Sequence, residues 1–251
     1  MIRNLVVGLW GLALLFFTGC ESADTPSGAA QSTPMGEDFS GEVAILPADV
    51  LSYLPERFEY LYPMVNEAAA RSLEAQGYQV IDGSAVNSAL DANGGALRKQ
   101  IASSNSQQMS QGITKLMGQL GSGQSVDALV IPQVLEQSMT LSKPYQGASW
   151  GGVRREFHVN GDRNVGSQIQ VDTASVVVGV YNRFGQAIYF GQGGIDFLEN
   201  ATQAGSNLYL TPKLSGQIAT ADVKDALDKA LARWQIEYSS LLGQRDSAHA
   251  Y

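Results

Sequence analysis

The chain has 251 residues and a mass of 26.8 kDa, a length suited to one large domain or two small ones, and its 44% of hydrophobic residues can form a core. Its formal net charge of −8 and its pI near 4.7 give no overall positive field, which argues against a nucleic-acid-binding protein. A single cysteine excludes a disulfide framework and any cysteine-rich zinc site, and two histidines leave little for histidine-based catalysis.

Residues 1–19 have the pattern of a signal peptide. Arg3 precedes an apolar run of 13 residues from Leu5 to Phe17, which as a helix is about 20 Å long and too short for a hydrocarbon core about 30 Å thick. The run ends in Phe17-Thr18-Gly19-Cys20, which resembles the lipobox of bacterial lipoproteins. The resemblance implies that Cys20 is acylated and becomes the mature N-terminus. The alternative is an ordinary secretory signal with an incidental cysteine.

The residue after the cysteine and the charge of the mature chain bear on location. Glu21 stands where an aspartate commonly retains lipoproteins at the inner membrane of Gram-negative bacteria, so the resemblance implies an outer-membrane anchor facing the periplasm. Loss of Arg3 leaves 15 cations against 24 carboxylates, a formal charge of −9, which discourages peripheral binding to anionic lipid. We therefore expect the covalent lipid at Cys20 to hold the protein on the membrane.

A tether connects the anchor to the folded part. Residues 20–40 begin with the acylated cysteine, and residues 21–40 are rich in serine, proline, glycine and acidic side chains, a composition typical of disorder. A flexible chain of this length has a root-mean-square span of about 25 Å. Residues 41–251 are predicted to form a single globular α/β domain.

The first half of this domain alternates short strands with helices. A buried strand is predicted over 42–47, and a helix from about Glu56 to Gly77. The next strand, 78–81, precedes a short helix with Ser84 as its N-cap, which runs through Leu90 and ends at 93–95. Apolar residues at helical spacing mark the long helix: Phe58, Leu61, Tyr62, Val65, Ala69 and Leu73.

The second half contains longer strands and a final helix. Residues 96–125 predict a loosely packed helical segment, since Ile113, Leu116, Met117 and Leu120 keep helical spacing in a Gln/Ser/Gly-rich stretch. A strand is predicted from Ala128 toward Leu141, then a polar insertion over 143–166, then a hairpin of strands 168–181 and 187–190. The last helix is predicted to begin with Thr220 as its cap and to end at Gly243. The fold class is α/β (α+β), a mixed β-sheet with packed helices.

Two short motifs carry a family resemblance. Gly77-Tyr78-Gln79-Val80-Ile81-Asp82 closes the first long helix and opens a strand, and Val126-Asp127-Ala128-Leu129-Val130 opens the second half. With the order of elements over 41–242, they resemble the domain shared by CsgG, the TolB N-terminal domain and LpoB. The resemblance implies a non-catalytic binding or scaffold protein, an accessory factor in cell-envelope assembly that binds an envelope protein, the cell wall or another copy of itself, with no cofactor beyond the lipid.

Candidate catalytic and metal-binding residues are few. His158 is the one plausible catalytic imidazole, but no G-x-S-x-G nucleophile motif accompanies it, so an exposed histidine on a hairpin is the preferred interpretation. Glu156, His158 and Asp162 could hold a divalent ion, although their spacing on a loop is poorly specific. The glycines at 121–123 and 191–194 lack the residues of a phosphate-binding loop and predict a helix stop and a bulged strand. We therefore assign no catalytic residue and no metal.

The insertion is the strongest candidate interaction surface. It carries Tyr145, Trp150, Arg154 and Arg155, residue types enriched at protein interfaces. The alternative is that Trp150 folds back as a lid over the sheet. Tyr53 and Tyr60 form a second candidate surface. Two other functions stay open: a cell-wall hydrolase that depends on His158 or an acidic cluster, and a protein that binds a small apolar ligand between the sheet and the helices.

Overall fold

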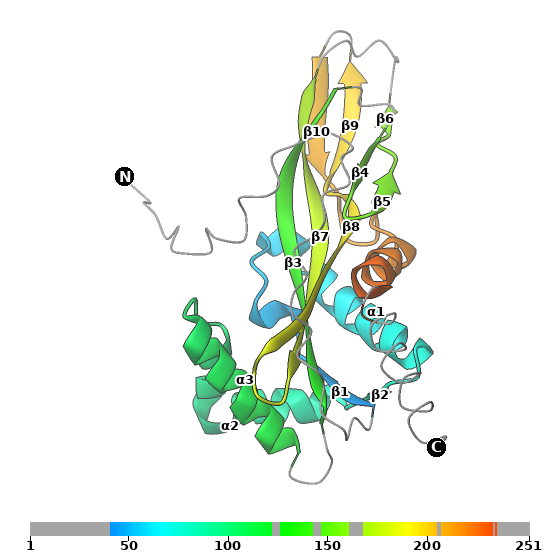
Figure 1. The fold of residues 1–251 in the computed structure, drawn as a ribbon. Coiled ribbons are helices and arrows are strands. Elements are labelled where there is room, and N and C mark those ends of the chain that lie inside the picture. Colours follow the sequence, from blue (N-terminus) through cyan, green and yellow to red (C-terminus); the bar gives the residue numbers. More distant parts are fainter. Residues whose placement is uncertain are drawn as a thin grey trace, which may run out of the picture.

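The computed structural model describes residues 41–121, 126–142, 147–160, 168–204, 207–232 and 234, so the predicted signal peptide, Cys20 and the tether lie outside it. One sheet has five strands in the order β2-β1-β3-β7-β8, and it is parallel among β2, β1 and β3 but antiparallel from β3 to β8 (Figure 1). The predicted mixed sheet is confirmed. Its strands are β1 (Glu42–Ile45), β2 (Gln79–Val80), β3 (Ala128–Leu141), β7 (Ile169–Asn182) and β8 (Ala187–Phe197).

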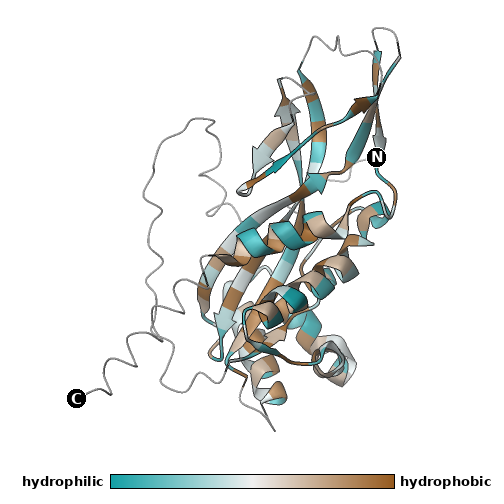
Figure 2. Cartoon of the chain, turned by 90° about the vertical axis from the view of Figure 1, so that its right-hand side faces the viewer, coloured by the Kyte–Doolittle hydropathy of each residue, from teal (hydrophilic) through white to brown (hydrophobic). Residues whose placement is uncertain are grey.

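Helices cover both faces of this sheet. Val43 and Ile45 of β1 share one buried cluster with residues of α1 (Leu61–Ala75) and of a helix over 220–232. Ala44 and Leu46 point to the opposite face and share a second cluster with α2 (Gly83–Ile101) and α3 (Ser106–Leu120), because side chains alternate along a strand. The body therefore has three layers. Figure 2 shows the helices with hydrophobic and hydrophilic faces, and no described helix is long and apolar enough to cross a membrane.

The chain between β1 and α1 is more irregular than the apolar pattern predicts. Two 3₁₀ turns, Ala48–Val50 and Glu56–Phe58, precede the α-helix, which begins at Leu61 rather than at Glu56. Pro63 then falls in the first turn of α1, where a backbone N–H has no partner within the helix, so the N–H that proline lacks is not needed. Phe58 is nevertheless fully buried, so the turn supplies a core residue that the pattern assigned to the helix.

The prediction for residues 84–125 is wrong in two respects. The helix does not end at 93–95 but continues through Gly94 and Gly95, at positive φ, to Ile101. The following segment is not loosely packed, because α3 buries Met109, Ile113, Leu116 and Met117 against Leu97 and Ile101 of α2. Burial of these side chains overrides the stop signal of the glycine pair, and the Gln- and Ser-rich positions form the outer face of the helices.

Two helices have a different N-cap residue from the one that the sequence predicts. Asp82, not Ser84, is the N-cap of α2, and its carboxylate accepts a hydrogen bond from the Ser84 amide at 2.9 Å. The last helix begins at Thr220, but the Ala219 carbonyl accepts its first hydrogen bond, from the Val223 amide, so Ala219 occupies the cap position. The predicted end of this helix at Gly243 lies beyond the described part of the chain.

A second unit, which we call the arm, extends from the body. It consists of the ends of β3 and β7, the hairpin of β4 (Ala148–Trp150) and β5 (Val153–Arg155), and a sheet in the order β10-β9-β6 (Figure 1). The sheet strands are β6 (Val159–Asn160), β9 (Glu199–Ala204) and β10 (Asn207–Pro212). A separate buried cluster holds these layers together: Leu141, Phe157, Val171, Phe197 and Ala201. The insertion predicted to be polar thus contributes strands and a small core.

The long strand β3 connects two opposite ends of the molecule. At its start, the Gly41 amide donates to the Asp127 carboxylate at 2.9 Å, so the chain enters the domain beside the first residue of β3. At its end, Leu141 lies in the core of the arm. Fourteen residues of strand span about 45 Å. The point where the chain enters the domain and the arm are therefore far apart.

Candidate interaction surface

The predicted interface residues of the insertion occupy different environments on the β4–β5 hairpin. Arg154 is exposed and pairs across the hairpin with exposed Ser149, whereas Trp150 and Arg155 are only partly exposed and face the body. Tyr145 belongs to residues 143–146, which the structure does not describe. The structure therefore brings Ser149 and Arg154 together on the outer face of the hairpin and places two of the predicted residues in contact with the domain itself.

Trp150 covers the sheet in the manner of a lid. Its ring lies edge-on to Phe197, with centroids 5.1 Å apart, and its indole N–H points to the Ala174 carbonyl at 3.4 Å. Gly194 lies directly beneath it, since a Cβ there would be 2.7 Å from the indole nitrogen. The exposed part of the ring could still meet a partner, but its packing contributes to the join between hairpin and sheet.

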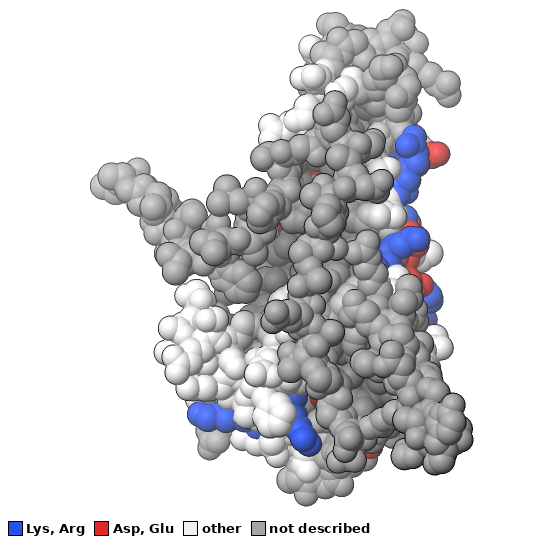
Figure 3. All heavy atoms as spheres, viewed as in Figure 1, with Lys and Arg blue, Asp and Glu red and all other residues white. Residues whose placement is uncertain are grey.

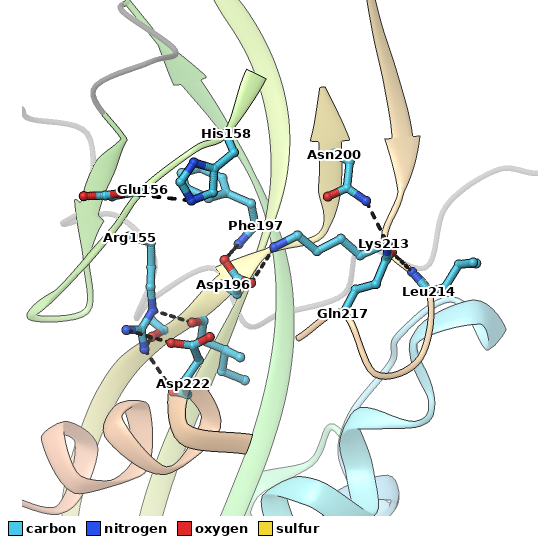
Figure 4. A network of polar contacts seen from close by, with 12 residues as sticks. Arg155, Glu156, His158, Asp196, Phe197, Asn200, Lys213, Leu214, Gln217 and Asp222 are labelled. Atoms are coloured by element: carbon cyan, nitrogen blue, oxygen red, sulfur yellow. Dashed lines mark hydrogen bonds and ion pairs between the residues drawn. The ribbon is translucent and has the colours of Figure 1, made fainter. Parts of the chain in front are cut away.

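Arg155 links the same hairpin to two other elements. Its guanidinium donates to the carbonyls of Gly194 and Ile195 in β8 at 3.2 and 2.6 Å, and to the Asp222 carbonyl at 2.9 Å. It also forms ion pairs with the carboxylates of Asp222 and Asp225 at 3.3 and 3.1 Å (Figure 4). With only 12% of its side chain exposed, Arg155 has little surface left for a partner. Arg154 is the better candidate for a partner contact.

His158 and Glu156 lie on the outer surface of the arm. The His158 imidazole is 83% exposed, and its Nε2 is 4.0 Å from a Glu156 carboxylate oxygen (Figure 4). Within the described ranges, no three His, Cys, Asp or Glu side chains gather closely enough to hold a metal ion, and Asp162 lies outside those ranges. The geometry near His158 is that of an exposed surface pair and supplies no ordered nucleophile–base arrangement.

A largely buried ion pair joins the arm to the body. Lys213, after β10, pairs with the Asp196 carboxylate of β8, which also accepts a hydrogen bond from the Phe197 amide at 2.7 Å (Figure 4). Burial raises the pKa of the nearby Tyr60 above its ordinary value, and the negative charge of Asp196 adds to the rise. The Tyr60 hydroxyl is buried, whereas Tyr53 is largely exposed, so the two tyrosines do not form one surface.

Three carboxylates lie together at the base of the arm. The Asp172 amide donates to Glu199 at 3.0 Å, and the Asp172 carboxylate accepts from the Ser138 hydroxyl at 2.5 Å. Burial raises the pKa of Glu136, and the charges of Asp172 and Glu199 raise it further, while Arg57 opposes them. Folding therefore makes the Glu136 carboxylate easier to protonate than it is in the unfolded chain.

We expect Glu136→Gln to stabilise the protein at neutral pH. Because the pKa of Glu136 is raised by folding, stability falls as the pH rises above the ordinary carboxyl pKa of about 4.3, and the ionised side chain is destabilising at pH 7. The gain should be about 0.5 kcal/mol or less, since this side chain is partly solvated. Thermal melting at pH 7 and pH 3.5 measures it. The gain should vanish at pH 3.5, and an equal gain at both values, or a gain from Glu74→Gln on exposed α1, would contradict the assignment.

The two glycine clusters have structural roles. Gly121 is the C-cap of α3, as predicted for a helix stop. The register of β7 and β8 shifts between Ala174 and Ser175, which confirms the predicted bulge near 191–194. Gly191 and Gly193 also allow the helix over 220–232 to lie directly on β8, since a Cβ would come within 1.8 Å of the Ala230 carbonyl and 1.9 Å of the Ala226 carbonyl.

Sequence reasoning missed most partners of these contacts. Asp222 and Asp225, near the start of the last helix, both bind Arg155, and no residue pattern in the sequence assigns them that partner. Two acidic residues three positions apart at the start of a helix could have indicated a cationic partner, although not which one. The Asp196–Lys213 pair carries no comparable signal. A comparison with models of known protein families finds no match, and no curated protein shows significant similarity to the chain.

Proposed function

We propose that this chain is a lipid-anchored, non-catalytic binding protein of the bacterial cell envelope. It is attached through Cys20 to the outer membrane, faces the periplasm, and acts as an accessory or scaffold factor that contacts an envelope protein or a second copy of itself. The lipobox-like sequence at Phe17–Cys20 supports the anchor, and the resemblance to CsgG-like and LpoB-like domains supports the role.

The observation that carries this proposal is the separation of the two ends of β3. The chain reaches the body at Gly41, bound to Asp127, whereas the exposed Ser149 and Arg154 lie on the arm. A lipid on Cys20 keeps the first end within reach of the membrane, and the arm lies about 45 Å from that end, the length of β3. This arrangement suits presentation of a surface to a partner in the periplasm.

The anchor is tested by replacing Cys20 with serine. We expect the variant to lose the mass of the acyl chains and to leave the membrane fraction, because the thiol is the acylation site. Intact-mass measurement and membrane fractionation give the two readouts. A protein that stays in the membrane at the same mass after Cys20→Ser contradicts lipidation.

The arm contact is tested by photo-crosslinking in cells. A crosslinking residue in place of Ser149 should capture a discrete protein or a second copy of the chain, and Arg154→Ala should lower its yield several-fold, because arginine anchors are typical of interface hot spots. The control places the crosslinker at exposed Glu74 in α1, on the body. Equal capture from both sites, or none from Ser149 in a lipidated and folded protein, contradicts the role of the arm.

A further inference from the structure

The turn between β7 and β8 lies at the end of the molecule where the chain enters the domain. Asn182, the last residue of β7, pairs with Ala128, and Ala128 follows Asp127, which binds the Gly41 amide. The turn thus lies close to the point where residues 21–40 would lead back to the lipid on Cys20. The turn and the arm lie at opposite ends of β3 and β7, so the length of these strands separates them.

This turn is rigid and displays a phenylalanine. The Asn182 carboxamide oxygen accepts hydrogen bonds from the amides of Phe184 and Gln186, each at 3.0 Å. Gly185 has φ +71°, and a Cβ there would be 2.3 Å from the Ser110 carbonyl of α3, so the turn is also seated closely against that helix. Phe184 is nevertheless 61% exposed. The structure therefore holds an apolar ring in solvent at a fixed position.

A second exposed ring lies nearby on the same hairpin. Phe190 is also 61% exposed and lies edge-on to Tyr181, with centroids 6.0 Å apart. The rings of Tyr181 and Phe190 both lie over Gly179, where a Cβ would be 2.9 Å from Tyr181 and 3.1 Å from Phe190. Burial raises the pKa of Tyr181 to about 12, so its hydroxyl is neutral at physiological pH. The hairpin thus carries a preorganised aromatic surface.

The charges around this surface differ from those of the chain as a whole. The Arg183 guanidinium lies over the Phe184 ring, 5.1 Å from its centroid. Helices α2 and α3, the second of which contacts the turn, carry Arg98, Lys99 and Lys115 but a single carboxylate, Asp91. Figure 3 shows mostly white and blue atoms over these helices. Arg98 is paired with Asp91 and with Asp49, so Lys99 and Lys115 are the cations that these two helices add to Arg183, and the negative charge of the chain is not concentrated on α2 and α3.

We propose that the aromatic surface of the β7–β8 hairpin docks on the bilayer that holds the lipid of Cys20. Its exposed rings are Phe184, with Arg183 over it, and Phe190, which packs edge-on against the more buried Tyr181. Phenylalanine is among the apolar residues that interfacial segments bury at the boundary between headgroups and acyl chains, and an arginine beside it can bind headgroup phosphates. This inference rests on the proposed lipid anchor. Twenty residues between Cys20 and Gly41 keep the domain near the bilayer, so even a weak surface contact becomes favourable through its high effective concentration.

Docking of this end fixes the orientation of the whole protein. With the hairpin on the bilayer, β3 and β7 point away from it and the arm is directed into the periplasm. The tether then limits how far the domain is from the membrane but does not set its tilt. The covalent lipid holds the protein, and the hairpin orients it.

Depth-dependent fluorescence quenching tests the docking. The lipidated full-length protein carries Phe184→Cys, labelled with an environment-sensitive thiol probe, and is reconstituted in phosphatidylethanolamine/phosphatidylglycerol vesicles with brominated acyl chains. An acylated Cys20 does not react, so one probe per chain is expected. The matched control is Tyr209→Cys on β10 of the arm, where another aromatic residue is 53% exposed. We expect bromine to lower emission at position 184 by roughly half and at position 209 hardly at all, since interfacial side chains reach about 5–10 Å into the bilayer.

The outcomes separate the docking from the anchor. Two labels per chain show that Cys20 is free and that the anchor itself fails. A correctly acylated protein with no quenching at position 184, or with equal quenching at both positions, overturns the docking. The docking is also overturned if the probe at position 184 is shielded from water but is not quenched by bromine, because a protein surface rather than the bilayer then covers it. Phe190→Ser in the Phe184→Cys protein should lower the quenching further toward that of position 209.

Discussion

Replacement of Gly193 by alanine should destabilise the domain by about 3 kcal/mol or more, the upper end of the usual range for overpacking, because the new atom meets rigid backbone. The added Cβ would lie 1.9 Å from the Ala226 carbonyl oxygen and 2.5 Å from its carbon, in the helix over 220–232. Neither β8 nor the helix can move far, because Leu227 and Ala230 are fully buried in the core between them. Urea unfolding of the purified domain measures the change.

Gly118→Ala is the control for this substitution. Gly118 lies in α3, and a Cβ there meets nothing within 4 Å. Alanine should therefore raise the free energy of unfolding by about 0.5–1 kcal/mol, the difference in helix propensity between the two residues. If Gly193→Ala changes stability as little as Gly118→Ala, then the helix does not lie on the backbone of β8.

The layers of the body could be predicted because their signals are local. The apolar runs of β1 and β3 and the stripe of α1 each appear within a short window, and β3 extends to Leu141 as expected. The prediction failed at Gly94-Gly95, where a local stop signal competes with the burial of Leu97 and Ile101. Such tertiary packing involves residues of α3 and β3, which no short window contains.

The strands of the arm could not be predicted, because their signals are not local. The sequence predicts no strands over 199–212, because these residues are mostly polar. In the structure β9 and β10 nevertheless pair along their whole length and direct Ala201, Leu208 and Leu210 to the core of the arm. Their pairing depends on a small core built from four distant segments. The candidate site could be predicted only in part, for the same reason. The residue types indicate the 143–166 insertion as a surface for partners, but only the structure distinguishes the exposed Arg154 from the largely buried Arg155.

The alternation of side chains along β5 gives those two arginines different roles. Val153 and Arg155 face the domain and Arg154 faces solvent, as the period of two in a strand requires. The partners of Arg155 in the last helix lie 67 and 70 positions away in the sequence. No spacing rule reaches that far, so interface enrichment of arginine could not by itself tell a surface contact from an internal one.

We expect Arg155→Ala to destabilise the protein by about 2–4 kcal/mol, because it leaves two carboxylates and the carbonyls of Gly194 and Ile195 without their donor. The estimate is below that for a fully buried pair, since Asp222 and Asp225 keep part of their solvent contact. The loss should be largest where the hairpin meets the body. Hydrogen exchange should therefore speed up in β4, β5 and the first turn of the last helix before it does in β1 or α1.

Arg154→Ala and Arg155→Lys complete the test. Arg154 is exposed, so its replacement should change stability by no more than about 0.5 kcal/mol. Lysine at position 155 keeps the charge but loses the planar fork that reaches β8 and the helix together, so an intermediate loss is expected. If Arg155→Ala instead leaves stability unchanged and abolishes capture of a partner from Ser149, then Arg155 is an interface residue and the hairpin is held to the body by its other contacts, such as those of Trp150 and Gly151. If only the substitutions of Arg155 lower stability, and only Arg154→Ala lowers capture, then Arg155 stabilises the fold and Arg154 contacts the partner.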